Sequence, residues 1–317
     1  MIVNKKSENI IVSVLCTAYN HESFIRQCLD GFVMQKTNFS FEAIVHDDAS
    51  TDGTAAIIRE YAEKYPDIIV PIYQTENQYS KKIGIYKTFL YPKAQGKYIA
   101  ICEGDDYWTD PYKLQKQVDI LENNPDCSFC CGGYIQEQAG VKDILQVEKR
   151  GDSDSFKFTL EEWLNEEWFT MPLTTLYRTK EFLTEISPYI ERYRYYRDVH
   201  MYYHLLLIGK GFYVSENWAN HIFHPGGVAS MQPEHVIAKN GYNVYRDLYK
   251  VTKDVRLKRF VRLFASFMML SVDKTESKLK LFLVALSVSQ SFHDVKMSCI
   301  VFVKVILRKI KSLFADK

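Results

Sequence analysis

Three acidic side chains stand within four positions at the end of an apolar run, in the segment Tyr98-Ile-Ala-Ile-Cys-Glu-Gly-Asp-Asp-Tyr-Trp108. They are Glu103, Asp105 and Asp106. Successive side chains of a strand alternate between its faces, so Glu103 and Asp105 are expected to point the same way and to hold a cation and a polar ligand together. Carboxylate oxygens suit Mg²⁺ or Mn²⁺ bound to a diphosphate. The plainer interpretation is a solvated acidic turn before a helix.

The segments around these acids predict an alternation of strands and helices. Apolar, β-rich runs indicate buried strands, and apolar residues spaced three and four apart indicate helices. This order predicts a mainly parallel α/β sheet flanked by helices. The expected strands are 10–16, 41–46, 68–73, 98–102 and a short one from 127 closed by the glycines at 132–133, and the expected helices are 21–34, 54–64 and 110–123.

Polar residues follow three of these strands directly. They occupy residues 17–20, 47–52 and 103–106. The C-terminal ends of parallel strands meet at one edge of a sheet, where ligands of such sheets bind. The sequence therefore predicts one site built from all three segments. Residues 141–158 are polar and charged, and we expect them to form a surface loop that borders the site.

Composition indicates a globular protein with an uneven charge distribution. The 317 residues are 47% hydrophobic and 25% charged, which is enough for one large or two modest domains. Residues 253–317 hold 14 Lys and Arg against 5 Asp and Glu, which leaves 26 against 34 in residues 1–252. The seven cysteines are scattered, so we expect neither a disulfide framework nor a zinc site at Cys127 and Cys130.

The two ends of the chain bear on its location. The first ten residues show no apolar signal stretch, and uncharged runs near the C-terminus are shorter than the roughly 20 residues that span a bilayer. A cytoplasmic protein without a transmembrane helix is expected. From 254 to 314 the sequence predicts basic amphipathic helices. These helices could lie on an anionic membrane, or they could pack on the catalytic domain or on a second subunit. Binding to nucleic acid is not expected, because the basic residues are not interleaved with aromatic residues on which bases could stack.

Taken together, three motifs resemble the family 2 glycosyltransferases of GT-A fold. The motifs are Val12-Ser-Val-Leu-Cys-Thr-Ala-Tyr-Asn20, His46-Asp-Asp-Ala-Ser-Thr-Asp-Gly-Thr54 and Glu103-Gly-Asp-Asp-Tyr-Trp108. Their order and spacing agree with the family, and the resemblance covers about residues 8–230. It implies a GT-A fold with a mixed, mainly parallel sheet flanked by helices and a C-terminal helical extension.

The resemblance also implies a division of the chain. A catalytic domain is expected over 1–235, with a nucleotide-binding half at about 8–130 and an acceptor-side half at about 131–235. The basic helical extension would then cover 236–317.

The family's nucleotide-sugar site maps onto named residues of this chain. The resemblance implies that Thr17, Tyr19 and Asp48 hold the base and ribose. A carboxylate can accept the imide N–H of uracil, and a tyrosine ring can lie against the base. The family's Asp-x-Asp motif has Glu103 in its first position here, which we expect to contact ribose or metal-bound water, with Asp106 as its support. Tyr19 and Asp48 could instead be an ordinary strand-end aromatic and a turn residue.

The metal and the catalytic base follow from the same resemblance. Asp105 is expected to bind Mn²⁺ or Mg²⁺, together with His224 of His224-Pro-Gly-Gly227, although Ile222 replaces an arginine that often precedes this motif. An inverting transferase needs a base for the acceptor hydroxyl, and Asp198 is the candidate. A plain helix-opening acid is the alternative for Asp198.

These inferences lead to one expected function and two alternatives. The expected function is metal-dependent, inverting transfer of a sugar from a nucleotide-sugar donor, specifically a UDP-sugar, to a saccharide hydroxyl in cell-surface polysaccharide synthesis. The acceptor would be lipid-linked, and the protein peripheral on the inner face of the plasma membrane. The alternatives are a nucleotidyltransferase, whose Gly-rich phosphate loop is absent from the sequence around residues 17–21, and an inactive membrane-associated binding module.

Overall fold

The computed structural model describes residues 9–138, 141–145, 154–165, 169–227, 232–270, 277–289 and 291–315. The chain forms two compact units. The first unit comprises Met1–Ser187 and Tyr202–Val228, and the second comprises Pro188–Met201 and Ala229–Lys317.

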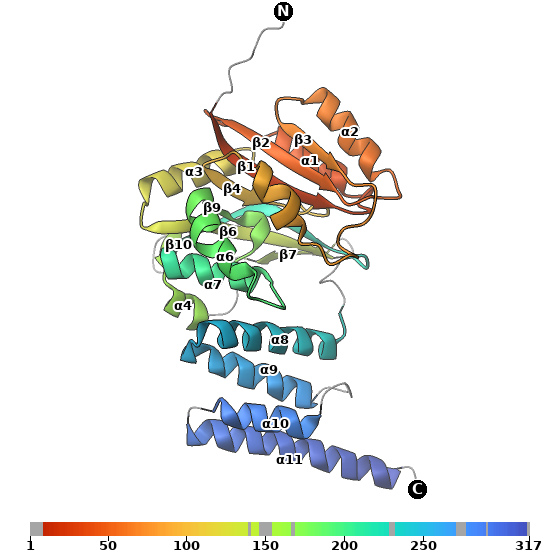
Figure 1. Ribbon diagram of the computed structural model, residues 1–317, viewed down its shortest axis with the longest axis vertical. Helices are drawn as coiled ribbons and strands as arrows, with labels where there is room; N and C mark the ends of the chain where they lie inside the picture. Colours follow the sequence, from red (N-terminus) through yellow and green to blue (C-terminus); the bar gives the residue numbers. More distant parts are fainter. Residues whose placement is uncertain are drawn as a thin grey trace, which may run out of the picture. The chain divides into compact units, whose positions relative to one another are not determined.

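One mixed sheet is the framework of the first unit (Figure 1). Its strands are β1 (Ile10–Ala18), β2 (Ser40–Asp47), β3 (Ile69–Tyr73), β4 (Tyr98–Ile101), β5 (Tyr107–Trp108), β6 (Cys127–Gln138), β7 (Val141–Leu145), β8 (Ser155–Phe158), β9 (Leu176–Arg178) and β10 (Lys210–Phe223). The order is β3-β2-β1-β4-β9-β6-β10-β5, with β7 beside β6 and β8 beside β10. As predicted, β1, β2, β3 and β4 are parallel. Strand β9 runs antiparallel to β4 and β6, so the second half of the sheet is mixed.

Helices cover the sheet and connect its strands. They are α1 (Ile25–Val33), α2 (Thr54–Lys64), α3 (Lys113–Asn123), α4 (Leu160–Asn165) and α5 (Thr179–Glu181). Two further helices, α6 (Ser187–Ile190) and α7 (Asp198–Ile208), each include residues of both units. Alternate residues of β1, such as Val12 and Val14, share a buried core with Leu29 of α1, Ile58 of α2 and Leu114 of α3. The three helices therefore cover the same face of the sheet.

The observed helices differ from prediction mainly at their first residues. Helix α2 has the predicted bounds. Helix α1 begins at Ile25 rather than at residue 21, because the chain first makes a tight turn in which Phe24 N–H donates to the His21 carbonyl oxygen at 2.9 Å. Helix α3 begins three residues later than predicted.

The prediction that glycines end the strand after Cys127 is wrong, because β6 continues through them to Gln138. Gly132 lies against the ring of Trp218, and a Cβ atom there would be 2.8 Å from the Cε3 atom of that ring. The glycine therefore makes room for packing rather than ending a strand. The predicted loop at 141–158 contains β7 and β8, while residues 146–153 lie outside the described residues.

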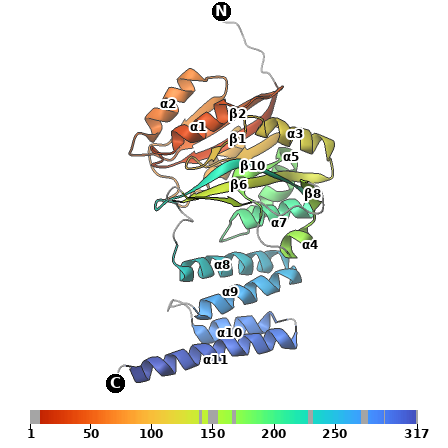
Figure 2. The ribbon, with the colours of Figure 1, turned by 180° about the vertical axis from the view of Figure 1, so that it is seen from behind.

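Four helices of the second unit pack in sequence, as both views show (Figures 1 and 2). They are α8 (Glu234–Thr252), α9 (Lys258–Leu270), α10 (Lys278–Ser287) and α11 (Phe292–Ala315). Tyr245 of α8 stacks on Phe260 and Phe264 of α9, with ring centroids 4.6 and 5.5 Å apart. The predicted C-terminal helices are thus confirmed. Across the described ranges, no helix is both long enough and apolar enough to cross a membrane.

A fully buried lysine lies between α3 and β5. The Nζ atom of Lys113 donates a hydrogen bond to Gln117 Oε1 at 2.7 Å and lies 4.0 Å from the centroid of the Trp108 ring. Burial lowers the pKa of Lys113 to about 7. The unfolded chain would hold this proton up to a pH near 10.5, so between about pH 7 and 10.5 the unfolded state binds more protons. Lys113 therefore makes the free energy of unfolding rise with pH across that window.

We expect Lys113→Met to raise the free energy of unfolding at pH 7 by about 2 kcal/mol. In the wild type, folding must strip the Lys113 amine of its hydration and favours loss of its proton, and the variant avoids both costs. The rise in stability between pH 7 and 10 should also become shallower than in the wild type. Urea unfolding at several pH values measures both effects. Lys116→Met, on the same helix but with a partly exposed amine paired to Asp110, is the matched control. An unchanged pH slope in Lys113→Met would contradict the prediction.

Candidate active site

The C-terminal ends of β1, β2 and β4 lie side by side, because these strands are parallel neighbours. Backbone hydrogen bonds continue past their ends: Gly104 N–H donates to the Thr17 carbonyl oxygen and Asp48 N–H to that of Ala18, both at 2.9 Å. The three polar segments predicted to meet are therefore brought together. All the predicted site residues except Asp198 belong to the first unit.

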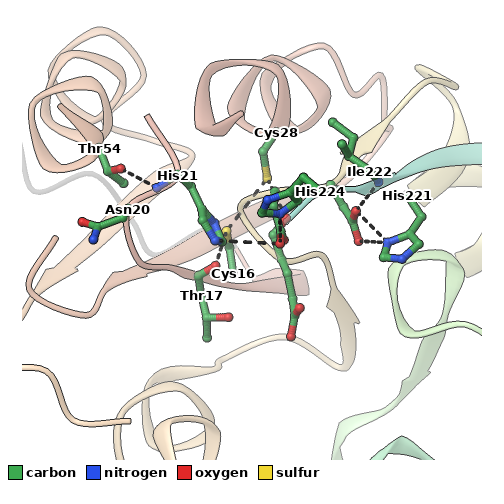
Figure 3. A network of polar contacts seen from close by, with 12 residues as sticks. Cys16, Thr17, Asn20, His21, Cys28, Thr54, His221, Ile222 and His224 are labelled. Carbon is green, nitrogen blue, oxygen red and sulfur yellow. Dashed lines mark hydrogen bonds and ion pairs between the residues drawn. The ribbon is translucent and has the colours of Figure 1, made fainter. Parts of the chain in front are cut away.

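Two imidazole rings approach the carboxylate of Asp105 (Figure 3). His224 Nε2 lies 3.1 Å from Asp105 Oδ2, and His21 Nε2 lies 3.8 Å from the same oxygen. Burial lowers the pKa of His21, which favours the neutral ring and its lone pair. The structure thus places His224 beside Asp105 and adds His21, which the sequence had not singled out.

The groups around Asp105 fit a divalent cation whose shell a diphosphate completes. A carboxylate oxygen and an imidazole nitrogen are ordinary ligands of Mn²⁺. Such ions commonly take their remaining ligands from substrate phosphates and water. Over the described part of the chain, no three His, Cys, Asp or Glu side chains form a complete cation cage. Asp105 and His224 would supply two ligands. Among the described residues, nothing forms a hydrogen bond with the buried Nδ1 atom of His21.

The neighbouring carboxylate, Asp106, is buried and held by the end of β10. Its Oδ1 atom lies 2.9 Å from His221 Nδ1 and accepts the N–H of Ile222 at 3.0 Å. Burial raises the pKa of Asp106. Burial also opposes the charged form of His221, but the hydrogen bond to Asp106 and the nearby carboxylate charges together outweigh burial and raise the pKa of His221. This contact ties the acidic loop to the strand that leads to His224.

We expect His221→Leu to weaken Mn²⁺ binding about 10- to 100-fold, because it removes the partner that holds Asp106 and the adjacent Asp105. His221→Asn keeps an N–H donor near the position of Nδ1 and should restore most of the affinity. Electron paramagnetic resonance of free Mn²⁺ measures the binding. Equal losses in the two variants would show that ring packing, and not the hydrogen bond, is what matters.

The end of β1 presents side chains suited to a planar ligand. Thr17 is half-buried, and the Tyr19 side chain is 44% exposed. Burial raises the pKa of Tyr86, which lies in a π-helical turn after β3, and the nearby charge of Glu103 raises it further. Glu103 itself is exposed. An aromatic face, hydroxyls and a carboxylate therefore stand near one another.

Two adjacent acids at the end of β2 have different environments. Asp48 accepts hydrogen bonds from the N–H groups of Gln78 at 2.7 Å and Tyr79 at 3.0 Å, one on each carboxylate oxygen. Asp47 is buried and accepts the N–H of Ser50 at 3.3 Å through Oδ2, while its Oδ1 has no hydrogen-bond partner within the described ranges. Asp48 thus fixes the loop after β3, whereas the oxygen without a hydrogen-bond partner among the described residues is on Asp47, which the sequence analysis had not selected.

The loops after β1 and β2 are joined by reciprocal hydrogen bonds. Asn20 N–H donates to Ser50 Oγ at 2.9 Å, and Thr51 N–H donates back to Asn20 Oδ1 at 2.8 Å. His21 N–H donates to Thr54 Oγ1 at 2.8 Å. Asn20 has a left-handed backbone, with φ of 55°, which asparagine tolerates better than most residues. The two loops are therefore joined to each other, and together they fix the backbone position of His21.

Asp198 opens α7 and belongs to the second unit. It is half-buried, and its Oδ1 accepts the N–H of Val199 at 3.1 Å. Burial raises the pKa of Asp198. Burial, and also the charge of Asp198, raises the pKa of Tyr245 on α8, so the two groups are near each other. Asp198 and Asp106 are thus the two predicted site residues for which burial raises the carboxyl pKa, which is the direction expected of a catalytic base.

Comparison with sequence families gives a match over more than half of the chain. The model described as Glycosyl transferase family 2 matches residues 13–197. An uncharacterized protein of Mycobacterium tuberculosis is 47% identical over 121 residues, which are 38% of this chain and 34% of that protein. The putative teichuronic acid biosynthesis glycosyltransferase TuaG of Bacillus subtilis is 32% identical over 154 residues, covering 47% of this chain and 58% of TuaG. The matched part thus spans between a third and three fifths of these relatives.

Solved structures resemble the chain over most of its length. TarS (residues 1–349) from S. aureus in complex with UDP-GlcNAc has a TM-score of 0.62 and 14% identity, covering 88% of this chain and 80% of that one. The mannosyltransferase PcManGT from Pyrobaculum calidifontis in complex with GDP-Man and Mn²⁺ has a TM-score of 0.53 and 14% identity, covering 99% and 92%. At this identity the likeness concerns the fold, and it confirms the predicted GT-A architecture.

Proposed function

The chain belongs to glycosyl transferase family 2, and from this premise we propose that it moves a sugar from a nucleotide-sugar donor to a hydroxyl group of a saccharide, with inversion at the anomeric carbon. The observation that carries the proposal is the approach of two imidazole rings, those of His224 and His21, to one carboxylate oxygen of Asp105. This point lies at the ends of three parallel strands, where sheets of this kind bind nucleotides.

We assign the nucleoside to Thr17, Tyr19 and the acidic pair Asp47 and Asp48. Backbone N–H groups occupy both carboxylate oxygens of Asp48, so Asp48 would shape the pocket. The unpartnered Oδ1 of Asp47 would accept the imide N–H of a uracil, which favours a UDP-sugar as donor. The exposed ring of Tyr19 would lie against the base, and Glu103 would contact the ribose.

The diphosphate would lie beside Asp105 and His224. A divalent metal held there, Mn²⁺ or Mg²⁺, would neutralise the charge that builds up on the leaving nucleoside diphosphate. Asp106 would keep the acidic loop in place through its contacts with His221 and Ile222. The complex of PcManGT with GDP-Man and Mn²⁺, a protein of similar fold, supports this assignment.

Asp198 would remove the proton from the acceptor hydroxyl as that oxygen attacks the anomeric carbon. Its raised pKa supports this role, because a base works best when its pKa is close to the working pH. The acceptor would be a saccharide of a cell-surface polysaccharide, as the teichuronic acid relative suggests. We further propose that a lipid carries this saccharide and that the protein works at the inner face of the plasma membrane.

Release of nucleoside diphosphate from a panel of nucleotide sugars tests the proposal without knowledge of the acceptor. Reactions are run with Mn²⁺, with Mg²⁺ and with a chelator. Release from one donor, dependent on metal, is the expected result and names the sugar. If no donor reacts, calorimetric titration with the same donors follows, and failure of every donor to bind would reject the proposed transferase.

A further inference from the structure

Helix α11 uses one side to pack within the second unit. Ser298 on this side is buried, and the ring of Phe302 stacks on Phe282 of α10 with centroids 4.2 Å apart and ring planes 9° apart. Asp294, one turn earlier, forms an ion pair of 2.7 Å with Arg262 of α9. Residues 294, 298 and 302 are spaced four apart and so share this inward side.

The opposite side of α11 carries aliphatic residues that no described part of the chain covers. Ile300, Val303 and Leu307 are 37%, 51% and 51% exposed. With Lys296 they are spaced by four, three and four residues, which places them along one face of the helix. Lys296 and Lys304 are also exposed. We call Lys296, Ile300, Val303, Lys304 and Leu307 the outer row.

The neighbouring helix α10 has a similar outer side. Leu279 and Leu283 are each 56% exposed and lie four residues apart, on the side away from buried Leu281 and Ala285. Lys280 beside them is also exposed. An array of aliphatic side chains of this kind is costly to leave in water, and it marks a surface that binds something.

Charge indicates what that partner is. The sequences of α9, α10 and α11 contain ten Lys and Arg and a single acid, Asp294, which is paired with Arg262. A second copy of the chain would bring the same positive charge to the contact and be repelled. Nucleic acid would match the charge, but it is bound through exposed aromatic rings, whereas the outer row is aliphatic. An anionic lipid surface matches both the charge and the aliphatic side chains.

We infer that the outer row of α11, together with Leu279 and Leu283 of α10, lies on an anionic bilayer. Ile300, Val303 and Leu307 would enter the boundary between headgroups and acyl chains, and Lys296 and Lys304 would reach the lipid phosphates. This inference deepens the proposed function, on which it rests for the lipid-linked acceptor, by naming the surface that brings the enzyme to the membrane.

Co-sedimentation of the full chain with vesicles tests the inference. The vesicles contain phosphatidylcholine alone or phosphatidylcholine mixed with phosphatidylglycerol. We expect binding to the mixed vesicles, at least tenfold weaker binding to phosphatidylcholine, and weakening by added salt. A variant with Ile300→Ser, Val303→Ser and Leu307→Ser, and a second with Lys296→Glu and Lys304→Glu, should each bind mixed vesicles at least tenfold less. Ile237→Ser, an exposed aliphatic residue on α8, is the matched control and should bind like the wild type.

Two further measurements separate the possible outcomes. Thermal unfolding and donor hydrolysis without vesicles should be unchanged in all variants, which shows that folding and the active site are intact. Vesicle binding by a wild type that hydrolyses no donor would reject the proposed function and leave the membrane surface standing. Equal vesicle binding by the triple variant and the wild type would overturn the inference. So would a wild-type dimer in solution that the triple variant abolishes, because a second copy would then cover the outer row.

Discussion

Asp105→Asn is expected to lower metal-dependent release of nucleoside diphosphate about a thousandfold. The change keeps the size of the side chain but removes the negative charge on the oxygen that His224 and His21 approach. A bound metal contributes several kcal/mol of charge stabilisation, and each 1.36 kcal/mol is worth about tenfold in rate. Initial rates at saturating donor, together with the dissociation constant for Mn²⁺, measure the loss.

Asp119→Asn is the matched control for this substitution. Asp119 is an exposed acid on α3 that accepts a hydrogen bond from Gln115, and its loss should change neither rate nor metal affinity. Weaker Mn²⁺ binding is the part of the result specific to Asp105. An Asp105→Asn enzyme that binds Mn²⁺ as tightly as the wild type would contradict the assignment, whatever its rate.

Asp198→Asn is expected to lower the turnover number about 100- to 10,000-fold while leaving donor binding intact, because it removes the base but not the donor pocket. Burial holds the pKa of Asp198 above that of an ordinary carboxyl group. The base acts as the carboxylate, so the wild-type rate should fall as the pH drops through this raised pKa. The residual activity of the variant should lack that acidic fall. Transfer to acceptor measured across pH, with calorimetric donor affinity alongside, gives both quantities.

Asp247→Asn serves as the control for Asp198→Asn. Asp247 lies on α8 in the same unit and accepts the N–H of Tyr195 at 3.0 Å, so its substitution tests whether a nearby carboxylate has the same effect. It should retain most activity and the acidic fall. A turnover number that is reduced equally in both variants would point to disturbed structure in place of a lost base.

Local signals in the sequence were sufficient for the first half of the sheet. The helix over Thr54–Lys64 was predicted with its observed bounds, since a turn-forming segment precedes it and its apolar spacing is regular. The strand beginning at Cys127 was predicted too short, because glycine is common both at strand ends and where a large ring needs space. Gly132 contacts Trp218, which is distant in the sequence, so the residues around Gly132 give no indication of this contact.

The same limit applies to the candidate site. The motifs indicated Asp105 and His224, but a lone histidine inside a strand, such as His221, has no spacing that marks it. The resemblance selected Asp48 and not Asp47, and it carried no sign that the backbone of a loop some thirty residues away, where Gln78 lies, donates to Asp48. The position of Asp198 in the second unit also depends on long-range packing.

The loops after β1 and β2 cannot be exchanged one at a time in a chimaera. Asn20 both donates to Ser50 and accepts from Thr51, and His21 donates to Thr54. Replacing one loop alone would therefore leave polar groups of the other loop without their hydrogen-bond partners. A chimaera designed to transfer donor preference from a relative must therefore exchange the loops after β1 and β2 together. For the same reason, substitutions in one loop are expected to survive in evolution chiefly when the other loop changes with them.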